Sequence, residues 1–330
     1  MLRKLSIVAR ILIAAAGVAY IVYSINWRDV TDAQASVQEP GVLTMLRGAD
    51  VLLLVIGLFI MAIVYPLQAL RWWLLMGARH IDAGYGRALR LYMVGSFFNF
   101  CMPGTTGGDV VKGYYAARHS DRRTDALMSI LFDRITGMIG LFLFAGVIAL
   151  VMLDHPLVRK LAMCSWAALL VMVVGYGCYS SRLLRRLLHI EKTRNWPVIG
   201  KFIAIIDDAA LAYRDHLGSV GVAIMISALA HFLLALALAL AGVALGVSAP
   251  IQLLMGINPA IVFVGALPIS YQGFGVQEGV AQAMIAGHAT MNQIVGMLMF
   301  FRLYMLVYAL CGSLFLIGGD IHMRPPSESN

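Results

Sequence analysis

The chain has 330 residues, of which 61% are hydrophobic and only 13% are charged. A soluble domain of this length carries roughly 25% charged residues, so most of this surface must face lipid rather than water. The formal net charge is +8, but no basic soluble module with interleaved aromatic residues accompanies it, which argues against nucleic-acid binding.

Apolar runs predict six membrane-spanning helices. A helix needs about 20 residues to cross the hydrocarbon core of a bilayer. The first run has a basic start and continues past the small residues Ala14–Ala16, so we expect an uncleaved helix rather than a signal peptide. The expected spans are 6–24, 51–76, 125–153, 161–180, 218–244 and 293–318.

Lysine and arginine predict the orientation of these spans. With the N-terminus in the cytoplasm, 19 of the 25 basic residues lie on the inner side, including Arg71 and Lys112, and 4 lie in outer loops. This asymmetry favours a multi-pass protein of the cytoplasmic (inner) membrane with both termini in the cytoplasm. Segment 181–217 combines apolar and basic residues and is expected to form an amphipathic linker on the inner leaflet.

Two further apolar segments, 88–123 and 251–292, are interrupted by proline and glycine. In the predicted orientation the first begins and ends on the inner side, and the second begins and ends on the outer side. Both are therefore expected to be re-entrant helical hairpins. Because non-helical backbone at membrane depth needs protein or a water-filled cavity around it, both should lie inside the bundle. The predicted fold is an all-α polytopic membrane protein with six full spans and two re-entrant hairpins.

The order of the elements predicts an inverted-topology repeat within a single transmembrane domain, residues 1–330. Residues 1–153 contain two spans, the inner hairpin and a third span. Residues 154–330 repeat this order in the opposite orientation, with the linker 181–217 and the outer hairpin 251–292. Repeats of this kind are common in transporters.

The tip of the first hairpin is the stretch Met102-Pro-Gly-Thr-Thr-Gly-Gly-Asp109. Its proline and glycines stop one helix, and its polar side chains can cap a second helix that we expect to begin near Val110. A helix N-terminus at membrane depth favours an anion such as phosphate. The alternative is a tight structural turn in which Asp109 serves only as a cap. The candidate substrate-binding residues here are Thr105, Thr106, Gly107, Gly108, Asp109 and Lys112.

The second hairpin carries hydrogen-bonding side chains in an otherwise apolar stretch, residues 267–278. Its glycines permit positive φ or a close backbone approach. Their spacing does not match a GxGxxG dinucleotide loop, and no βαβ context surrounds them. The candidate substrate-binding residues are Ser270, Gln272, Gly273, Gly275 and Glu278.

Arg134 and Arg302 fall inside predicted spans. A central arginine costs about 2.5–3.5 kcal/mol on insertion scales, so it should face a partner or a cavity. One interpretation is internal pairing, of Arg134 with Asp109 or Asp133 and of Arg302 with Glu278. The other is substrate binding, since an arginine can exchange a carboxylate for a substrate phosphate. Both arginines are therefore candidate substrate-binding residues, and proton coupling by Asp109 and Glu278 is a further alternative.

No pattern predicts a catalytic residue, a metal site or a cofactor. The four cysteines form no CxxC pair and lie in or beside apolar segments, as is typical of small core residues. Asp207-Asp208 lacks the further aspartates expected of a metal–diphosphate site. A Walker A sequence is absent from the chain, so ATP hydrolysis is not expected.

Three stretches resemble the family of lysylphosphatidylglycerol synthase transmembrane domains, also called flippase-like membrane proteins: PGTTGGDVVKGYY (103–115), SILFDRITG (129–137) and LPISYQGFGVQEG (267–279). Asp133 and Lys112 stand where Glu and Arg are expected. The resemblance implies lipid translocation, and relatives are associated with aminoacylated phospholipids, polyprenyl-phosphate-linked sugars or hopanoid pathways. Lipid-aminoacylating members carry a large soluble C-terminal domain. Because this chain ends 12 residues after Gly318, synthesis of lysyl-lipid by this chain alone is not expected.

We therefore expect a flippase or transporter, rather than an enzyme, for a phosphate-containing lipid such as a phospholipid or a polyprenyl-phosphate-linked molecule. The expected partners are membrane lipids with anionic or phosphate-bearing head groups, with a homo-oligomer and lipid-synthesis enzymes as further expectations. Two alternatives stay open. One is a membrane enzyme acting on a lipid-linked phosphate or sugar, with Asp109, Asp133 or Glu278 as base or metal ligand. The other is a non-catalytic scaffold of a lipid-synthesis complex.

Overall fold

The computed structural model describes residues 26–32, 37–39, 41–81, 83–101, 107–118, 123–152, 156–180, 216–267 and 270–317, with Tyr23 and Tyr213 as single residues. Within these ranges, five helices are long and apolar enough to cross a membrane, so the chain is a multi-pass membrane protein. They confirm five of the six predicted spans, whereas span 6–24 and most of the linker 181–217 lie outside the described residues. The five are α3 (Val51–Gly77), α6 (Arg123–Leu150), α7 (Pro156–Ser180), α11 (Leu217–Ala244) and α14 (Met291–Ile317).

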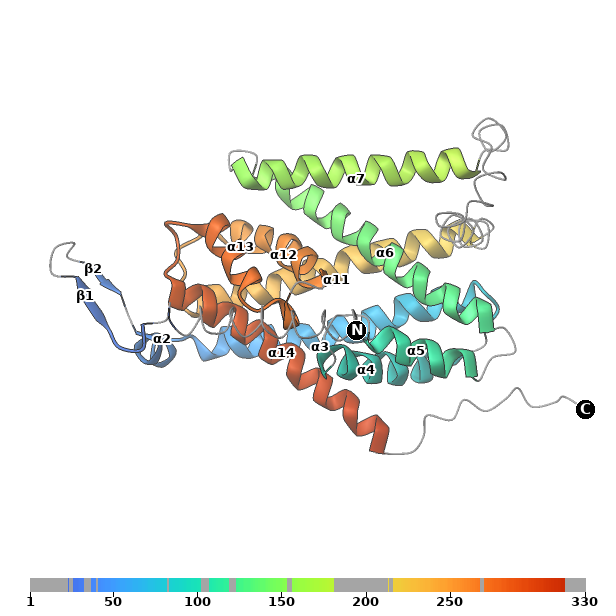
Figure 1. Cartoon of the computed structure of the whole chain (residues 1–330), viewed down its shortest axis with the longest axis horizontal. Helices are drawn as coiled ribbons and strands as arrows, with labels where there is room; N and C mark the ends of the chain where they lie inside the picture. Colours follow the sequence, from blue (N-terminus) through green and yellow to red (C-terminus); the bar gives the residue numbers. More distant parts are fainter. Residues whose placement is uncertain are drawn as a thin grey trace, which may run out of the picture.

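Helices α3 and α11 form the centre of the bundle and pack along each other (Figure 1). They are antiparallel, since the Asp50 N–H just before α3 donates to the Ala244 carbonyl at the end of α11, at 2.9 Å. The Asp50 side chain also caps α3 by accepting from the Leu53 N–H at 3.2 Å. Helix α6 packs across both α3 and α11.

Helix α7 lies at the periphery and packs mainly against α6 (Figure 1). Large apolar side chains on α7 are exposed, among them Leu170, Val171 and Val173. Exposed apolar residues on a spanning helix are the surface that lipid tails cover. The exposed apolar side chains of α7 are therefore expected to face lipid, as its position at the edge of the bundle requires.

Two pairs of shorter helices occupy the segments predicted as hairpins. Helices α4 (Tyr85–Cys101) and α5 (Gly107–Arg118) pack against each other. Helices α12 (Ile251–Ala266) and α13 (Val276–Ile285) do the same, with the 3-10 turn η2 (Tyr271–Gly273) between them. In Figure 1 the two pairs lie toward opposite ends of the bundle. At 1.5 Å per residue, α4 and α12 are each about 25 Å long, shorter than a hydrocarbon core of about 30 Å.

A short β-ribbon follows the first described residues, and the sequence analysis did not predict it. Strands β1 (Val30–Asp32) and β2 (Val37–Glu39) pair antiparallel, with Val30 opposite Glu39, and α2 (Val42–Arg47) follows. Each strand has three residues, too few for an alternating pattern to stand out in a sequence. The predicted all-α fold class is confirmed for the described residues, with this one small ribbon as an addition to the helical bundle.

Helix α14 connects distant parts of the chain. It packs extensively against α4, where Gly312 meets the backbone so closely that an added Cβ would overlap the Met93 carbonyl oxygen. At its beginning, the Asn292 side chain exchanges two hydrogen bonds with the backbone of Asn26, at 2.9 and 3.0 Å. Both ends of α14 are thus fixed to residues from the first third of the sequence.

Candidate functional site

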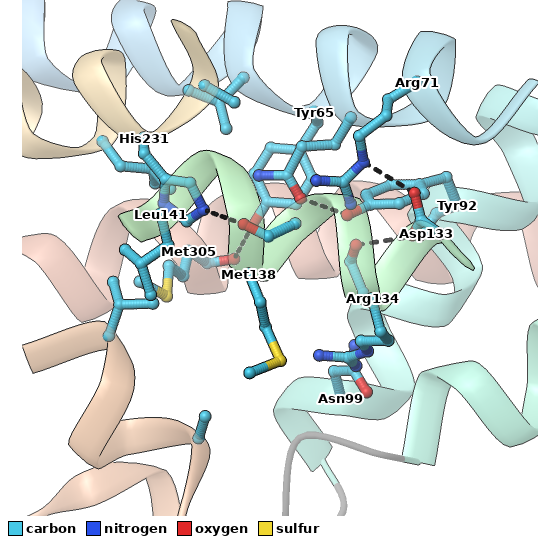
Figure 2. Close-up of a pocket in the computed structure, with 18 of the residues that line it drawn as sticks. Tyr65, Arg71, Tyr92, Asn99, Asp133, Arg134, Met138, Leu141, His231 and Met305 are labelled. Atoms are coloured by element: carbon cyan, nitrogen blue, oxygen red, sulfur yellow. Dashed lines mark hydrogen bonds and ion pairs between the residues drawn. The ribbon is translucent and has the colours of Figure 1, made fainter. Parts of the chain in front are cut away.

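A cavity of about 480 Å³ lies within the bundle, with lining residues from both halves of the chain (Figure 2). In Figure 2 the charged residues Arg71, Asp133 and Arg134 gather on one side, whereas Met138, Leu141 and Met305 lie toward the other. The cavity therefore has a polar end and an apolar end. The polar lining residues are Tyr65, Gln68, Arg71, Tyr92, Ser96, Asn99, Asp109, Lys112, Asp133, Arg134, His231 and Gln272.

Helical spacing places the polar residues of α3 and α6 on the cavity. Gln68 and Arg71 are three residues apart on α3, and Asp133 and Gly137 are four residues apart on α6. Residues at these spacings share a helix face. Helix α3 therefore presents two polar side chains to the cavity, and α6 presents the Asp133 carboxylate and, one turn later, the Gly137 carbonyl oxygen.

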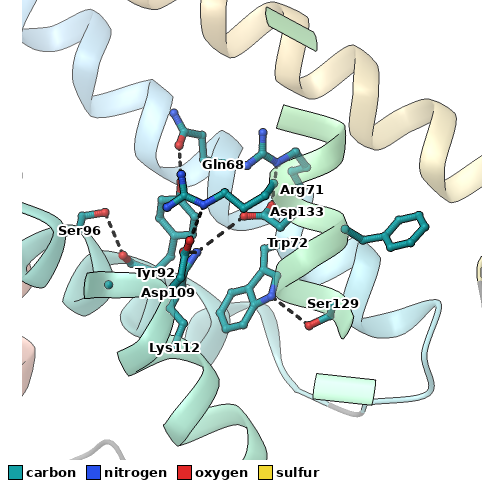
Figure 3. A network of polar contacts seen from close by, with 12 residues as sticks. Gln68, Arg71, Trp72, Tyr92, Ser96, Asp109, Lys112, Ser129 and Asp133 are labelled. Carbon is teal, nitrogen blue, oxygen red and sulfur yellow. Dashed lines mark hydrogen bonds and ion pairs between the residues drawn. The ribbon is translucent and has the colours of Figure 1, made fainter. Parts of the chain in front are cut away.

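Arg71 and Asp133 join α3 to α6. The Arg71 Nε donates to Asp133 Oδ1 at 2.8 Å, and both residues are buried (Figure 3). Arg71 Nη1 also donates to Ser227 Oγ on α11 at 2.7 Å. One guanidinium thus connects α3, α6 and α11, with its charge compensated by a carboxylate as a buried cation requires.

Lys112, in the second turn of α5, brings this helix into the same network. Its Nζ lies 2.9 Å from Asp109 Oδ1 and 3.7 Å from Asp133 Oδ2. The ammonium also lies over two aromatic rings, 5.3 Å from the centroid of Trp72 and 4.7 Å from that of Tyr92. Cation–π contacts of this kind stabilise a desolvated ammonium, so a buried lysine is well accommodated here.

Asp109 is held between two cations. Its Oδ1 pairs with Lys112, and its Oδ2 accepts from Arg134 Nε. The Arg134 side chain is 43% exposed, the Asp109 side chain 15%, and the Asp133 side chain only 3%. The Asp109–Arg134 pair therefore lies at the accessible edge of the network, while Arg71 and Asp133 are enclosed.

The cavity lining has an excess of positive charge. Arg71, Lys112 and Arg134 face two carboxylates, Asp109 and Asp133. Between low-dielectric walls such an excess attracts an anion. Neutral polar groups complete the lining, including Tyr92, which donates to Gln68, and His231, whose Nε2 lies 3.3 Å from the Gly137 carbonyl oxygen.

The tips of the two helix pairs meet beside the cavity. Asn99 near the end of α4 accepts the Gly108 N–H with its side-chain Oδ1 at 2.7 Å. From the other pair, Gln272 donates its Nε2 to the carbonyl oxygens of Asn99 and Phe100, at 3.0 and 3.1 Å. These carbonyls belong to the last turn of α4, where no further helix turn supplies donors. Gln272 has φ of 51°, a left-handed conformation that is uncommon for a side-chain-bearing residue.

A second buried polar cluster lies around Arg302. Its Nη1 donates to Glu278 Oε1 at 2.5 Å, its Nη2 donates to Gln277 Oε1 at 2.8 Å, and its guanidinium carbon lies 4.0 Å from the Phe274 ring centroid. Glu278 is fully buried and also accepts the Gly275 N–H at 2.8 Å. Gly273 and Gly275 have φ of 73° and 81°, which confirms the expected positive φ.

The predicted site residues are divided between these two regions. Four of them line the cavity: Asp109, Lys112, Arg134 and Gln272. Thr105 and Thr106 lie outside the described residues. The others are close in sequence to lining residues but are not part of the lining: Gly107, Gly108, Ser270, Gly273, Gly275, Glu278 and Arg302.

One expectation about this region needs correction, since helix α5 begins at Gly107 rather than near Val110. The carboxylate of Asp109 pairs with two cations, which goes against the alternative that it serves only as a cap. The Gly108 N–H in the first turn of α5 donates to Asn99. The internal pairs Asp109–Arg134 and Glu278–Arg302 are confirmed.

Arg71 lines the cavity, but the sequence did not identify it as a site residue. Together with Lys112 it was counted among the inner-side charges, yet both are buried in the bundle. The excess of basic residues on the predicted inner side persists without them. The signal was present in the spacing, since Gln68, Arg71 and Trp72 lie on one face of an otherwise apolar helix.

The arrangement is suited to binding an anion next to an apolar surface. Among the described residues, no group of three or more His, Cys, Asp or Glu side chains is placed to hold a metal ion. The two cavity carboxylates are both engaged by cations. What the cavity offers a ligand is therefore positive charge, hydrogen-bonding groups and an apolar wall.

The comparison with protein families agrees with the sequence resemblance. A search of curated proteins and a search of solved structures each gave no match. Residues 7–312 match the protein family described as the lysylphosphatidylglycerol synthase TM region. Because this match spans nearly the entire sequence, from within the first predicted span to within α14, the chain belongs to the lysylphosphatidylglycerol synthase TM region family.

Proposed function

We propose that this protein is a flippase that moves a lipid with a phosphate-bearing head group across the cytoplasmic membrane, without changing the lipid chemically. The observation that carries the proposal is the cavity, in which cations outnumber carboxylates at one end and apolar side chains form the other. An anionic head group joined to a hydrocarbon tail has the same two-part character. The family name, which refers to a synthase of a charged phospholipid, is consistent with such a substrate.

The cations supply the interactions that a head group loses on leaving water. Arginine binds phosphate oxygens through paired N–H donors, and lysine adds a compact positive charge. Arg134 is the partly exposed cation of the lining, so a head group would reach it first. Lys112 and Arg71 lie deeper in the network and are held by carboxylates.

The size of the cavity limits how much of the lipid enters. Pockets for drug-sized ligands measure about 300–1,000 Å³, so a cavity of about 480 Å³ suits a head group and not two acyl chains. The apolar lining includes the buried residues Leu141 and Leu234 and also Phe263, which is exposed and gives this end of the cavity a surface toward lipid. The tails would stay in the bilayer while the head group passes through protein.

We further propose that the pairs α4–α5 and α12–α13 are re-entrant hairpins that enter from opposite leaflets, as parts of an inverted repeat. Three features support this assignment: their short helices, their positions toward opposite ends of the bundle in Figure 1, and the contact of their tips through Gln272. Opposed hairpins that meet beside a central cavity suit alternating access from the two leaflets. Cytoplasmic termini complete the proposed topology.

Transport can be measured after reconstitution in liposomes. Head-group-labelled anionic phospholipid is placed in both leaflets, and a membrane-impermeant quencher is added outside. We expect quenching beyond the outer-leaflet fraction with the protein and not with empty liposomes. Arg134→Ala should slow this phase at least tenfold, whereas the matched control Arg159→Ala, at an exposed position on α7, should not.

The same experiment separates translocation from the other two functions. A chemically altered lipid without translocation would indicate the membrane enzyme and would contradict the flippase proposal. An unaltered lipid that stays in its leaflet, with protein correctly folded by its thermal transition, would contradict it equally and would favour the scaffold. Mass spectrometry of the lipids recovered from the liposomes decides between these outcomes.

A further inference from the structure

We propose that Asp109 is an internal competitor of the substrate, and that a singly charged phosphodiester head group enters the cavity by replacing the Asp109 carboxylate on Lys112 and Arg134. This inference rests on the proposed function. It adds the charge class of the substrate and assigns a specificity-determining role to a residue that does not itself bind the lipid.

The Asp109 carboxylate is held as an anionic ligand would be. Each of its oxygens has its own cation, with Lys112 Nζ 2.9 Å from Oδ1 and Arg134 Nε donating to Oδ2. The cations come from different helices, α5 and α6. A phosphodiester also presents two charged oxygens on one centre, and lysine and arginine bind both kinds of anion. The cations that hold Asp109 can therefore hold the head group in the same way.

The second carboxylate of the cavity shows why exchange is assigned to Asp109. Asp133 and its partner Arg71 have side chains that are 3% and 8% exposed. Removing one partner from such a pair leaves a buried charge without compensation, at high cost. The side chains of Asp109 and Arg134 are 15% and 43% exposed. A ligand can thus open the Asp109–Arg134 pair first and then reach Lys112, which is 5% exposed, while the Arg71–Asp133 pair stays closed.

Charge balance in the cavity predicts the class of head group. The lining holds three cations and two carboxylates, and the Asp109 carboxylate stays in the cavity when a head group takes its place on Lys112 and Arg134. One singly charged phosphodiester therefore brings the count to three negative charges against three positive ones. A phosphomonoester carries about 1.5 to 2 negative charges at pH 7, which exceeds this balance, and an uncharged head group leaves the excess positive charge uncompensated. The phosphodiester is therefore favoured over both.

Competition between the Asp109 carboxylate and the head group also favours release of the lipid. A transporter must bind its substrate well enough for entry and weakly enough for departure. When the head group leaves, the Asp109 carboxylate returns to the two cations, so they do not remain unpaired. The competitor therefore lowers the affinity and speeds dissociation.

Equilibrium binding to the full chain in a neutral detergent tests the exchange. Phosphatidylglycerol labelled on one acyl chain serves as the phosphodiester probe. We expect Asp109→Asn to bind it about tenfold more tightly than the wild type, a change of about 1.4 kcal/mol, and to transport it more slowly in liposomes because release is slowed. Asp109→Glu keeps the competing carboxylate and should bind with nearly the wild-type affinity.

Asp125→Asn is the matched control, since it removes the same charge from a partly exposed pair, with Arg79, that lies on α6 outside the cavity lining. Tighter binding by both Asn variants would reveal a general effect of charge and would overturn the exchange, as would unchanged or weaker binding by Asp109→Asn. Phosphatidic acid, a phosphomonoester, should bind the wild type more weakly than phosphatidylglycerol does, and the opposite order would also contradict the inference.

The outcomes for the two proposals are distinguishable. Binding that responds to Asp109→Asn as expected, without any translocation in liposomes, would remove the flippase function and leave the exchange intact. Translocation of phosphatidylglycerol with no effect of Asp109→Asn on affinity would support the flippase function and overturn the exchange. A wild type and an Asp109→Asn variant that both fail to bind anionic lipid would overturn the anion site, and the exchange with it.

Discussion

Arg71 on α3 and Asp133 on α6 are 62 positions apart in the sequence, yet their side chains meet at 2.8 Å. This pair fixes the polar end of the cavity to two long spanning helices rather than to the shorter helix pairs. The shorter helices add Asp109 and Lys112 to a framework that the long helices already hold. The charged network thus has an enclosed inner part and a more accessible outer part.

Substituting Arg71 should destabilise the protein more than substituting both members of the pair. In Arg71→Met, the Asp133 carboxylate stays buried, with Lys112 3.7 Å away as its remaining cation. Breaking a buried pair costs about 3–5 kcal/mol, so we expect a clear fall in the thermal transition temperature measured in detergent. The double variant Arg71→Met, Asp133→Leu should recover part of that loss, because no uncompensated charge remains. A double variant less stable than Arg71→Met would contradict this account.

Substitutions of Glu278 should follow the order of the contacts that they remove. The carboxylate pairs with Arg302 and also accepts the Gly275 N–H. Glu278→Gln keeps an acceptor for this N–H and loses only the charge, whereas Glu278→Ala loses both contacts and leaves Arg302 buried with one fewer partner. We expect Ala to lower the thermal transition temperature more than Gln, and both to lower it relative to wild type. Equal transitions for the two variants would show that the Gly275 contact contributes nothing.

Linking the tips of the two helix pairs should stop transport. Gln272 now joins them through its hydrogen bonds to Asn99 and Phe100, and alternating access requires this contact to open. In a background without native cysteines, the variant Asn99→Cys, Gln272→Cys can be joined by a short, reductively cleavable bis-thiol reagent. We expect lipid translocation in liposomes to fall on linking and to recover after reduction. Each single-cysteine variant is the control, and full transport by the linked protein would exclude movement at this contact.

Gly108 should not tolerate a side chain. An added Cβ would overlap the backbone of Gly95 on α4, so Gly108→Ala must separate α4 from α5. Gly86 on α4 is a matched control, since an added Cβ there has no atom within 4 Å. We expect Gly108→Ala to lower the thermal transition temperature, and Gly86→Ala to leave it unchanged or to raise it, because alanine favours a helix over glycine by about 1 kcal/mol. Equal effects would refute close packing at Gly108.

The predicted orientation can be tested with impermeant thiol reagents. Leu43 on α2 and Gly84 before α4 are both exposed, and the excess of basic residues places them on opposite sides of the membrane. In a cysteine-free background, Leu43→Cys should react from outside in intact cells, whereas Gly84→Cys should react only after permeabilisation. The reverse pattern would invert the topology while leaving the fold as described.

The long helices could be predicted from sequence because their signal is local. Twenty or more apolar residues in a row identify a span wherever it packs, and all five described spans lie within a few residues of the predicted ranges. The internal pairs Asp109–Arg134 and Glu278–Arg302 could also be predicted from the sequence, since a charge inside a span requires a partner. Glycine-containing turns predicted the positive φ at Gly273 and Gly275.

The cavity could not be predicted, because it depends on which helix faces meet. The contact of Arg71 with Asp133 and Ser227 arises from the packing of α3, α6 and α11, and no sequence pattern encodes those neighbours. Arg71 also lies near the predicted end of a span, where a charge is easily assigned to the loop. In the same way, Arg302 has all the features of a site residue in sequence, but its neighbours separate it from the cavity lining.

The close crossing of α14 and α4 at Gly312 and Met93 has a mechanical consequence. It locks the last span of the second half to the helix pair of the first half, at backbone contact. Any large rearrangement must then keep these two elements together as one piece. The two halves of the sequence therefore cannot move apart as two separate bodies. Each moving part must instead contain helices from both halves.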